Sequence, residues 1–185
     1  MEQFEWLRNY IPQNEQEEKD KQVMLNFTEK FDNLFTREND IAHFTASAWV
    51  VNPERTKVLM IYHNIYQSWA WTGGHADGET DLLKVAVKEL KEETGVEKVT
   101  VISEEPFSIE VLCVNGHEKR GKYVSSHLHF NVTFLLEVTE EEMLRCKPDE
   151  NSGVKWCCLK DVEKLSSEPW MNERIYRKLN GRLNM

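Results

Sequence analysis

The chain has 185 residues, a formal net charge of −9 and a hydrophobic content of 40%. This length is that of one domain with room for a helical extension, and the apolar content is sufficient for an ordinary core. The negative charge argues against binding to a nucleic acid polymer, because neutralising phosphates requires a basic surface.

The hydrophobic residues never form an 18-residue run, so the sequence predicts no membrane-spanning segment. The first residues lack the basic and apolar regions of a secretory signal, and the four cysteines lack Cys-x-x-Cys spacing. We therefore expect a cytoplasmic protein with reduced thiols and without a zinc–thiolate site.

Two helices are predicted in the N-terminal part of the chain. The first spans residues 2–11 and ends before Pro12, and the second spans about residues 15–35. Apolar residues recur at helical spacing in the second helix: Val23, Met24, Phe27, Phe31, Leu34 and Phe35. Residues 1–38 are thus expected to form a helical extension packed on a domain of residues 39–185. Binding of a partner, such as a second copy in a homodimer, is the alternative use of this apolar stripe.

The rest of the chain mixes strand and helix patterns. Strands are predicted at 44–51, 57–63, 68–72, 99–102, 107–114, 124–138 and 154–158. Helices are predicted at 80–94 with Thr80 as the N-cap, at a short segment starting with residue 139, at 159–165 and at 168–179. Residues 115–123 have the composition of a polar loop, and the alternation in 124–138 indicates a half-buried antiparallel strand. Together these elements indicate an α+β fold with a mixed sheet.

Three glutamates lie near the C-terminal end of the helix predicted at 80–94. At about 100° per residue, Glu89, Glu92 and Glu93 lie within roughly 100° of one another, at the edge of the buried stripe. Negative charge is unfavourable there, because the C-terminal end of the helix dipole is also negative. Carboxylate oxygens in that position favour a hard cation such as Mg²⁺. The alternative is a solvated helix in which neighbouring lysines pair with the glutamates.

The pair Gly73–Gly74 directly follows an aromatic strand and precedes the acidic loop and the glutamate helix. A double glycine lets the backbone approach another group closely, and a glycine carbonyl can join the ligands of a cation. The combination of strand, glycine pair, acidic loop and glutamate helix favours a functional metal site over a solvated surface helix.

The stretch 74–96 resembles the signature of the Nudix hydrolases. That signature is a glycine, five residues, a glutamate, seven residues and then Arg-Glu-apolar-x-Glu-Glu-x-Gly-apolar. Counted from Gly74, the spacing is intact, and residues 88–96 read Lys-Glu-Leu-Lys-Glu-Glu-Thr-Gly-Val. Thr80 stands where the family has glutamate. Lys88 stands where the family has the arginine thought to orient the glutamates, and lysine lacks the planar fork of arginine. The resemblance covers about residues 40–165.

The resemblance implies a Nudix-like α/β/α sandwich with a mixed, partly antiparallel sheet. The N-terminal helix lies outside the resemblance and is expected as an addition to this fold. The resemblance also implies a pyrophosphohydrolase that cleaves a diphosphate linkage in a small-molecule nucleoside diphosphate derivative or nucleotide. Mg²⁺, or Mn²⁺ as its substitute, would be held by Glu89, Glu92, Glu93 and the carbonyl group of Gly73. A carboxylate would deprotonate the attacking water, with Glu89 as the first candidate and Glu150 as the second.

Two alternatives use the same motif. The departures at Thr80 and Lys88 are compatible with a non-catalytic sensor that binds a nucleotide-like ligand. The branch of the family that isomerises an isoprenoid diphosphate requires a cysteine just before a Gly-His pair. Gly73 occupies that place in this chain, which argues against the isomerase.

Three histidines are candidate substrate-binding residues. His75 follows the glycine pair, where it could touch a phosphate, a metal-bound water or only the turn itself. His127 and His129 lie on one face of the strand predicted at 124–138, where they could line the substrate pocket or bind a metal. The polar side of a half-buried strand is the simpler interpretation of these two residues.

Arg120 and Trp69 are the remaining candidates for substrate binding. Arg120 lies in a compact basic loop with Lys119 and Lys122, which could meet substrate phosphates or form a solvated hairpin tip. Trp69 could stack on a base or pack in the core.

Overall fold

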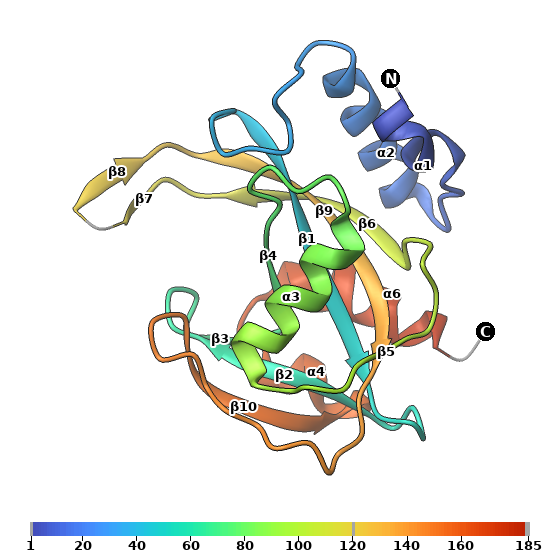
Figure 1. Cartoon of the computed structure of the whole chain (residues 1–185), viewed down its shortest axis with the longest axis vertical. Coiled ribbons are helices and arrows are strands. Elements are labelled where there is room, and N and C mark those ends of the chain that lie inside the picture. Colours follow the sequence, from blue (N-terminus) through green and yellow to red (C-terminus); the bar gives the residue numbers. More distant parts are fainter. Residues whose placement is uncertain (1, 120, 184–185) are drawn as a thin grey trace.

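The computed structural model describes residues 2–119 and 121–183, whose strands form an eight-stranded sheet and a separate hairpin. The strands of the sheet are β1 (Ala42–Val51), β2 (Lys57–His63), β3 (Ser68–Ala70), β4 (Thr72–His75), β5 (Thr100–Val101), β6 (Ser108–Val114), β9 (His127–Glu137) and β10 (Asn151–Cys158). Their order is β10-β2-β1-β9-β5, with β3 paired to β2, β4 to β1 and β6 to β9. The hairpin consists of β7 (His117–Lys119) and β8 (Lys122–Val124), and it extends away from the body of the molecule (Figure 1).

Strand β1 lies at the centre of the sheet and is buried along its whole length. It pairs in parallel with β9 and antiparallel with β2 and β4, while β9 pairs antiparallel with β5 and β6. The predicted mixed sheet is therefore confirmed. The predicted half-buried antiparallel strand at 124–138 is wrong in detail. Strand β9 begins at His127, runs parallel to β1 and is buried on both faces from residue 130 to residue 136.

Helices cover both faces of the sheet, which confirms the α/β/α sandwich (Figure 1). Helices α1 (Glu5–Asn9), α2 (Glu15–Thr28) and α3 (Leu82–Thr94) share one core with the face of β1 that carries Phe44. The opposite face of β1, at Trp49, packs on the C-terminal elements, which are η2 (Leu159–Asp161), α4 (Val162–Leu165), α5 (Pro169–Met171), the π-helix η3 (Asn172–Tyr176) and α6 (Arg177–Arg182). A short 3-10 turn, η1 (Glu2–Phe4), precedes α1. Among the described helices, none has the length and apolar character needed to cross a bilayer.

Both N-terminal helices are shorter than predicted, and the one expected at residues 2–11 is a 3-10 turn followed by α1, which ends at Asn9. Helix α2 ends at Thr28, and the apolar repeat continues to Phe35 without helical backbone. The Leu34 carbonyl accepts the Phe44 amide at 2.7 Å, and the Phe35 carbonyl accepts the Gly78 amide at 2.8 Å. These residues are buried by packing against the sheet, so their spacing reflects burial and not a helix.

Four other predicted elements also need correction. Asp81 and not Thr80 caps α3, since its side chain accepts the Lys84 amide, and the helix begins at Leu82. The short helix expected after residue 138 is absent, because residues 139–142 form only a turn. The polar loop expected at 115–123 contains the β7–β8 hairpin. The helix expected at 168–179 is broken into α5, η3 and α6 and extends to Arg182.

Helix α2 covers the free edge of β6. The Asp20 carboxylate accepts the Val111 amide at 2.9 Å, and the Gln16 side chain donates to the Ile109 carbonyl at 3.3 Å. An uncovered edge strand presents unpaired backbone groups to other chains, and these two side chains satisfy part of that edge.

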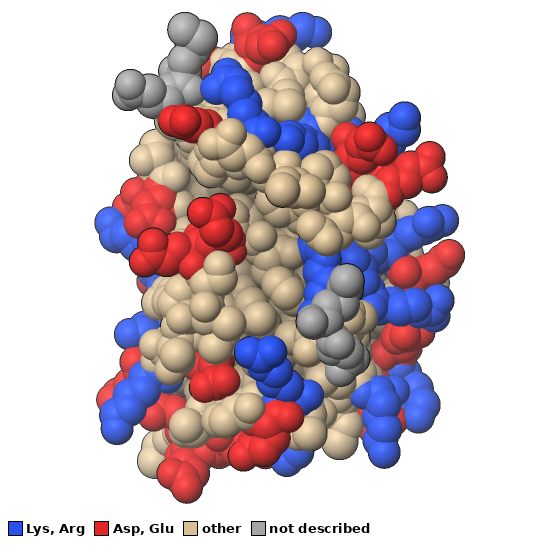
Figure 2. Space-filling view, turned by 90° about the vertical axis from the view of Figure 1, so that its right-hand side faces the viewer, with Lys and Arg blue, Asp and Glu red and all other residues tan. Residues whose placement is uncertain are grey.

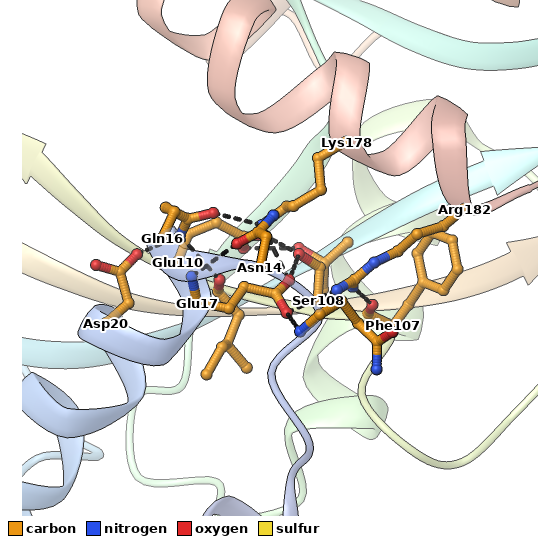
Figure 3. Close-up of polar contacts among 12 residues, drawn as sticks. Asn14, Gln16, Glu17, Asp20, Phe107, Ser108, Glu110, Lys178 and Arg182 are labelled. Carbon is orange, nitrogen blue, oxygen red and sulfur yellow. Dashed lines mark hydrogen bonds and ion pairs between the residues drawn. The ribbon is translucent and has the colours of Figure 1, made fainter.

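A buried ion-pair network joins α2 to α6 across β6 (Figure 3). Glu17, which is fully buried, pairs with Lys178 at 3.1 Å and with Arg182 at 2.6 Å. Lys178 also pairs with the buried Glu110 at 3.0 Å, and the Ser108 hydroxyl donates to Glu17 at 3.0 Å. Burial raises the pKa of Glu17, but Lys178, the Gln13 amide and Arg182 outweigh it and hold that pKa below its ordinary value. That residues 1–38 form an extension distinct from a domain of residues 39–185 stays a prediction.

We predict that Glu17→Ala lowers the free energy of unfolding by about 3–5 kcal/mol, because it leaves Arg182 buried without its carboxylate partner. Urea denaturation at neutral pH measures this. The control Glu18→Ala removes an exposed carboxylate from the same helix and should change stability by less than about 0.5 kcal/mol. Equal effects of the two substitutions would show that the network contributes nothing.

Candidate functional site

The glycine pair lies in β4, where it brings the strand into contact with α3. Gly74 pairs with Ala46 of β1, and a Cβ added at Gly74 would lie 2.5 Å from the Glu89 carboxyl carbon. A Cβ added at Gly73 would lie 2.4 Å from the Ser47 hydroxyl oxygen. Both distances are shorter than a carbon contact allows, so only glycine fits between β1 and the carboxylate of Glu89.

Glu93 is the most buried of the three helix glutamates, with 3% of its surface exposed. Its carboxylate accepts the Gly73 amide at 3.0 Å. Burial raises its pKa to about 8, and the nearby Glu89 and Glu150 act in the same direction, against the hydrogen bond from Gly73. Without a cation this side chain therefore carries a proton at neutral pH.

Glu89 lies between Gly74 and Lys88. Only 12% of its side chain is exposed, and the Lys88 ammonium lies 3.2 Å from its carboxylate. Burial raises the pKa of Glu89 although Lys88 opposes the shift. Lys88 also reaches Glu92 at 3.6 Å, so it bridges two of the three glutamates.

Lys147 connects the glutamate helix to Glu150, and no pattern in the sequence pointed to this lysine. Its ammonium lies 3.2 Å from Glu92 and 2.9 Å from Glu150. Burial lowers the pKa of Lys147, but hydrogen bonds to Glu150 and Glu92 outweigh it and raise that pKa above its usual range. Burial raises the pKa of Glu92, but Lys147 and Lys88 lower it below its ordinary value. Glu150 thus lies near the helix glutamates, and its role as an alternative base stays a prediction.

The donor set at this site fits a hard divalent cation. It consists of carboxylate oxygens, which Mg²⁺ and Mn²⁺ prefer, and two of the carboxyls have pKa values raised by burial. The ligand atoms of Glu89, Glu92 and Glu93 do not all lie within 4.8 Å of one another in the described structure. Two ammonium groups, those of Lys88 and Lys147, pair with these carboxylates.

Four histidines gather on the opposite side of β4. Ring nitrogens of His43, His75 and His129 lie within 4.8 Å of one another. His127 is adjacent, with its Nε2 atom 3.1 Å from that of His129. The structure therefore brings together the three histidines selected from the sequence. His43 was missed because it stands at the very start of a strand; its register opposite His129 in the parallel β1–β9 pair comes only from the fold.

Burial lowers the pKa of two of the histidine rings. Burial lowers the pKa of His129 to about 2, and the neighbouring His75, His43 and His127 lower it further. Burial also lowers the pKa of His43, which is 4% exposed.

Trp69 lies apart from both groups of residues. Its ring packs against Tyr62 at 5.5 Å, and the Lys155 ammonium lies 3.9 Å above it. These are contacts of the outer β2–β10 part of the sheet. Arg120 lies outside the described residues.

On the face shown in Figure 2, acidic and basic side chains surround a central band of uncharged residues, so the net negative charge does not collect into one acidic surface there.

Known proteins resemble this chain in sequence family and in fold. A family model described as NUDIX domain matches residues 42–179. The structure of an Ap4A hydrolase complex from C. elegans is 22% identical, with a TM-score of 0.56, and covers 76% of this chain and 97% of that one. A hydrolase of the NUDIX family from Clostridium perfringens is 19% identical, with a TM-score of 0.54 and the same coverages. The E. coli dihydroneopterin triphosphate pyrophosphohydrolase is 15% identical, with a TM-score of 0.56, and covers 75% and 95%. No curated protein matches the sequence.

The fold and the glutamate helix behind a glycine pair define a hydrolase domain of the class that acts on pyrophosphate bonds. Because the family model matches most of its length, the chain belongs to the Nudix family.

We predict that the metal-free protein loses stability as the pH rises from about 5 to 8. The pKa of Glu93 rises from 4.5 in the unfolded chain to about 8 in the folded chain, so the folded chain holds more protons across this window. Glu93→Gln should flatten this part of the profile, measured by urea denaturation in chelator at several pH values. Identical profiles for the two proteins would contradict the raised pKa.

Proposed function

We propose that the chain is a metal-dependent pyrophosphohydrolase that cleaves a diphosphate linkage in a nucleoside diphosphate derivative or a nucleotide. The observation that carries this proposal is the buried Glu93, held by the Gly73 amide and beside the carboxylate of Glu89. Buried carboxyls with raised pKa values are costly for folding, and a cation bound among them would remove that cost.

The cation in this proposal is Mg²⁺, with Mn²⁺ as a possible substitute. Glu89, Glu92, Glu93 and the carbonyl group of Gly73 would hold it. When bound, such a cation neutralises the charge of a diphosphate and makes phosphorus more electrophilic. The glycine pair lets the backbone of β4 lie close to α3. The carbonyl group of Gly73 and the carboxylates of α3 could therefore bind the same cation.

The general base in the proposal is Glu89, with Glu150 as the second choice. The raised pKa of Glu89 makes it a better proton acceptor than an ordinary surface carboxylate, and Lys88 holds one of its oxygens. Glu150 is held by Lys147, which also contacts Glu92. Either carboxylate would take the proton of the attacking water, and the lysine beside it would fix its orientation.

The substrate is a small molecule in this proposal, and neither a nucleic acid polymer nor a membrane is involved. Two of the structural neighbours are named for a dinucleoside polyphosphate and for a pterin triphosphate. Their identity to this chain is too low to choose between such substrates. Substrate contacts by His75, His127, His129, Arg120 and Trp69 stay predictions, as do a homodimer and a cytoplasmic location.

A second candidate function is a non-catalytic sensor of a nucleotide-like ligand. The observation in its favour is the position of Lys88. Its ammonium group contacts carboxylate oxygens of both Glu89 and Glu92, and these are oxygens that a cation would need as ligands. A lysine bound in this way competes with a divalent ion. The sensor would be supported if a nucleotide raised the melting temperature of the protein but was not hydrolysed, with Mg²⁺ or with Mn²⁺ present.

We predict that Glu93→Gln lowers turnover by roughly a hundredfold or more, because a cation ligand is replaced by a neutral amide. The substrate is first found by assaying nucleotides, nucleotide sugars, ADP-ribose and dinucleoside polyphosphates with Mg²⁺. Glu97→Gln, at an exposed position just beyond α3, is the matched control and should keep full turnover. Undiminished turnover in a folded Glu93→Gln protein would overturn the assignment.

A further inference from the structure

The histidine cluster lies where three strands meet at one end of the sheet. His43 is at the start of β1, His75 at the end of β4, and His127 and His129 at the start of β9. The ring of His43 lies 5.2 Å from that of His75, 4.9 Å from that of His127 and 5.1 Å from that of His129. Ring nitrogens of three of these imidazoles, those of His43, His75 and His129, lie within 4.8 Å of one another, and His127 lies beside them.

Backbone carbonyl groups fix the tautomers of two of these rings. The Nδ1 atom of His43 lies 2.9 Å from the Asn39 carbonyl oxygen, and that of His127 lies 2.8 Å from the Ser125 carbonyl oxygen. A carbonyl only accepts, so each Nδ1 carries the proton and each Nε2 presents a lone pair. Metal-binding histidines in proteins are commonly oriented in this way, by a hydrogen bond from the ring nitrogen that does not bind the metal.

The Nε2 atom of His43 is buried and, within the described part of the chain, has no hydrogen-bond partner. Buried polar atoms are nearly always paired, and an unpaired lone pair inside a protein is costly. The neighbouring groups are histidine rings and not apolar side chains, so the unpaired atom faces potential co-ligands.

The spacing of the nitrogens suits one metal ion. Two nitrogens bound at about 2.0–2.1 Å to one tetrahedral ion lie roughly 3.3 Å apart. The Nε2 atoms of His127 and His129 are 3.1 Å apart, close to that value. Without an ion this contact is a hydrogen bond in which the Nε2–H group of His129 donates to His127, and a bound ion would replace that proton. The nitrogens of His43, His75 and His129, which lie within 4.8 Å of one another, need only small rotations of their rings to close on the same ion.

We propose that His43, His75, His127 and His129 bind one divalent transition-metal ion of the Zn²⁺ type, at a site separate from the α3 carboxylates. Neutral imidazole nitrogens suit Zn²⁺, Co²⁺ and Ni²⁺, whereas Mg²⁺ requires oxygen ligands. Four protein ligands close a tetrahedral site, which is the pattern of structural metal sites.

The ion would tie β4 to β1 and β9. His75 directly follows Gly74, and the Thr45–His75 and Ala46–Gly74 pairs are adjacent in the ladder between β1 and β4. Fixing His75 thus fixes the strand end that carries the glycine pair. A metal at this site would stabilise the arrangement on which the carboxylates depend without taking part in their chemistry.

The test is the titration of the chelator-treated full chain with Co²⁺ and Zn²⁺ in excess Mg²⁺. We expect one Co²⁺ per chain, with the strong visible absorption bands of a tetrahedral nitrogen site, and displacement of the Co²⁺ by Zn²⁺. His75→Asn and His127→Gln should each weaken Zn²⁺ affinity at least about tenfold. The control His63→Gln removes a histidine that stacks on Tyr66 outside the cluster, and it should bind as the unmodified chain does.

Two further measurements separate the outcomes. Glu93→Gln should keep the Co²⁺ bands, which distinguishes this site from the carboxylate site even if the proposed hydrolase activity is wrong. If a histidine variant does not fold, imidazole nitrogen NMR of the unmodified chain replaces it: Zn²⁺ should shift the signals of the four cluster histidines and leave that of His63. Absence of Co²⁺ bands, or binding that is lost in Glu93→Gln and kept in His75→Asn, would overturn the proposal.

Discussion

The close approach of β4 to α3 is the constraint on which the rest of the site depends. Gly73 and Gly74 leave no room for a side chain between β1 and Glu89, and the Gly73 amide binds the buried carboxylate of Glu93. The backbone of one strand therefore positions two acids of the helix. The ammonium groups of Lys88 and Lys147 pair with Glu89 and Glu92 from the solvent side.

A second constraint is the polar inner face of the sheet. The Asn131 amide accepts from Thr45 and Ser47 and donates to Glu110, so it links β1, β9 and β6 through buried hydrogen bonds. His129 of the histidine cluster lies two residues before Asn131 on β9. Glu110, which accepts from Asn131, pairs with Lys178 of α6 (Figure 3). Satisfied polar networks of this kind favour one specific strand register, because a slip would leave several buried groups unpaired.

The local elements of the site could be predicted from the sequence, but its long-range contacts could not. The spacing from Gly74 to Glu93 predicted the helix that carries the glutamates, since helical periodicity depends on nearby residues. It was wrong about the glycine pair, which lies within strand β4 and not in a turn after a strand, because the pairing of β4 with β1 is a long-range contact. His43 and Lys147 were missed, because each reaches the site only through the packing of strands or loops distant in sequence. The apolar repeat to Phe35 predicted too long a helix, because burial in a loop and burial on a helix produce the same spacing.

The central claim is that the α3 carboxylates bind a divalent cation, and proton release on Mg²⁺ binding tests it most directly. At pH 7 a group with a pKa of about 8 is mostly protonated, and a cation bound to Glu93 must displace that proton. Calorimetric titration with Mg²⁺ in buffers of different ionisation enthalpy should therefore show the release of close to one proton per chain, falling towards zero above about pH 9. Mg²⁺ binding without proton release at pH 7, or no binding at all, would contradict the account.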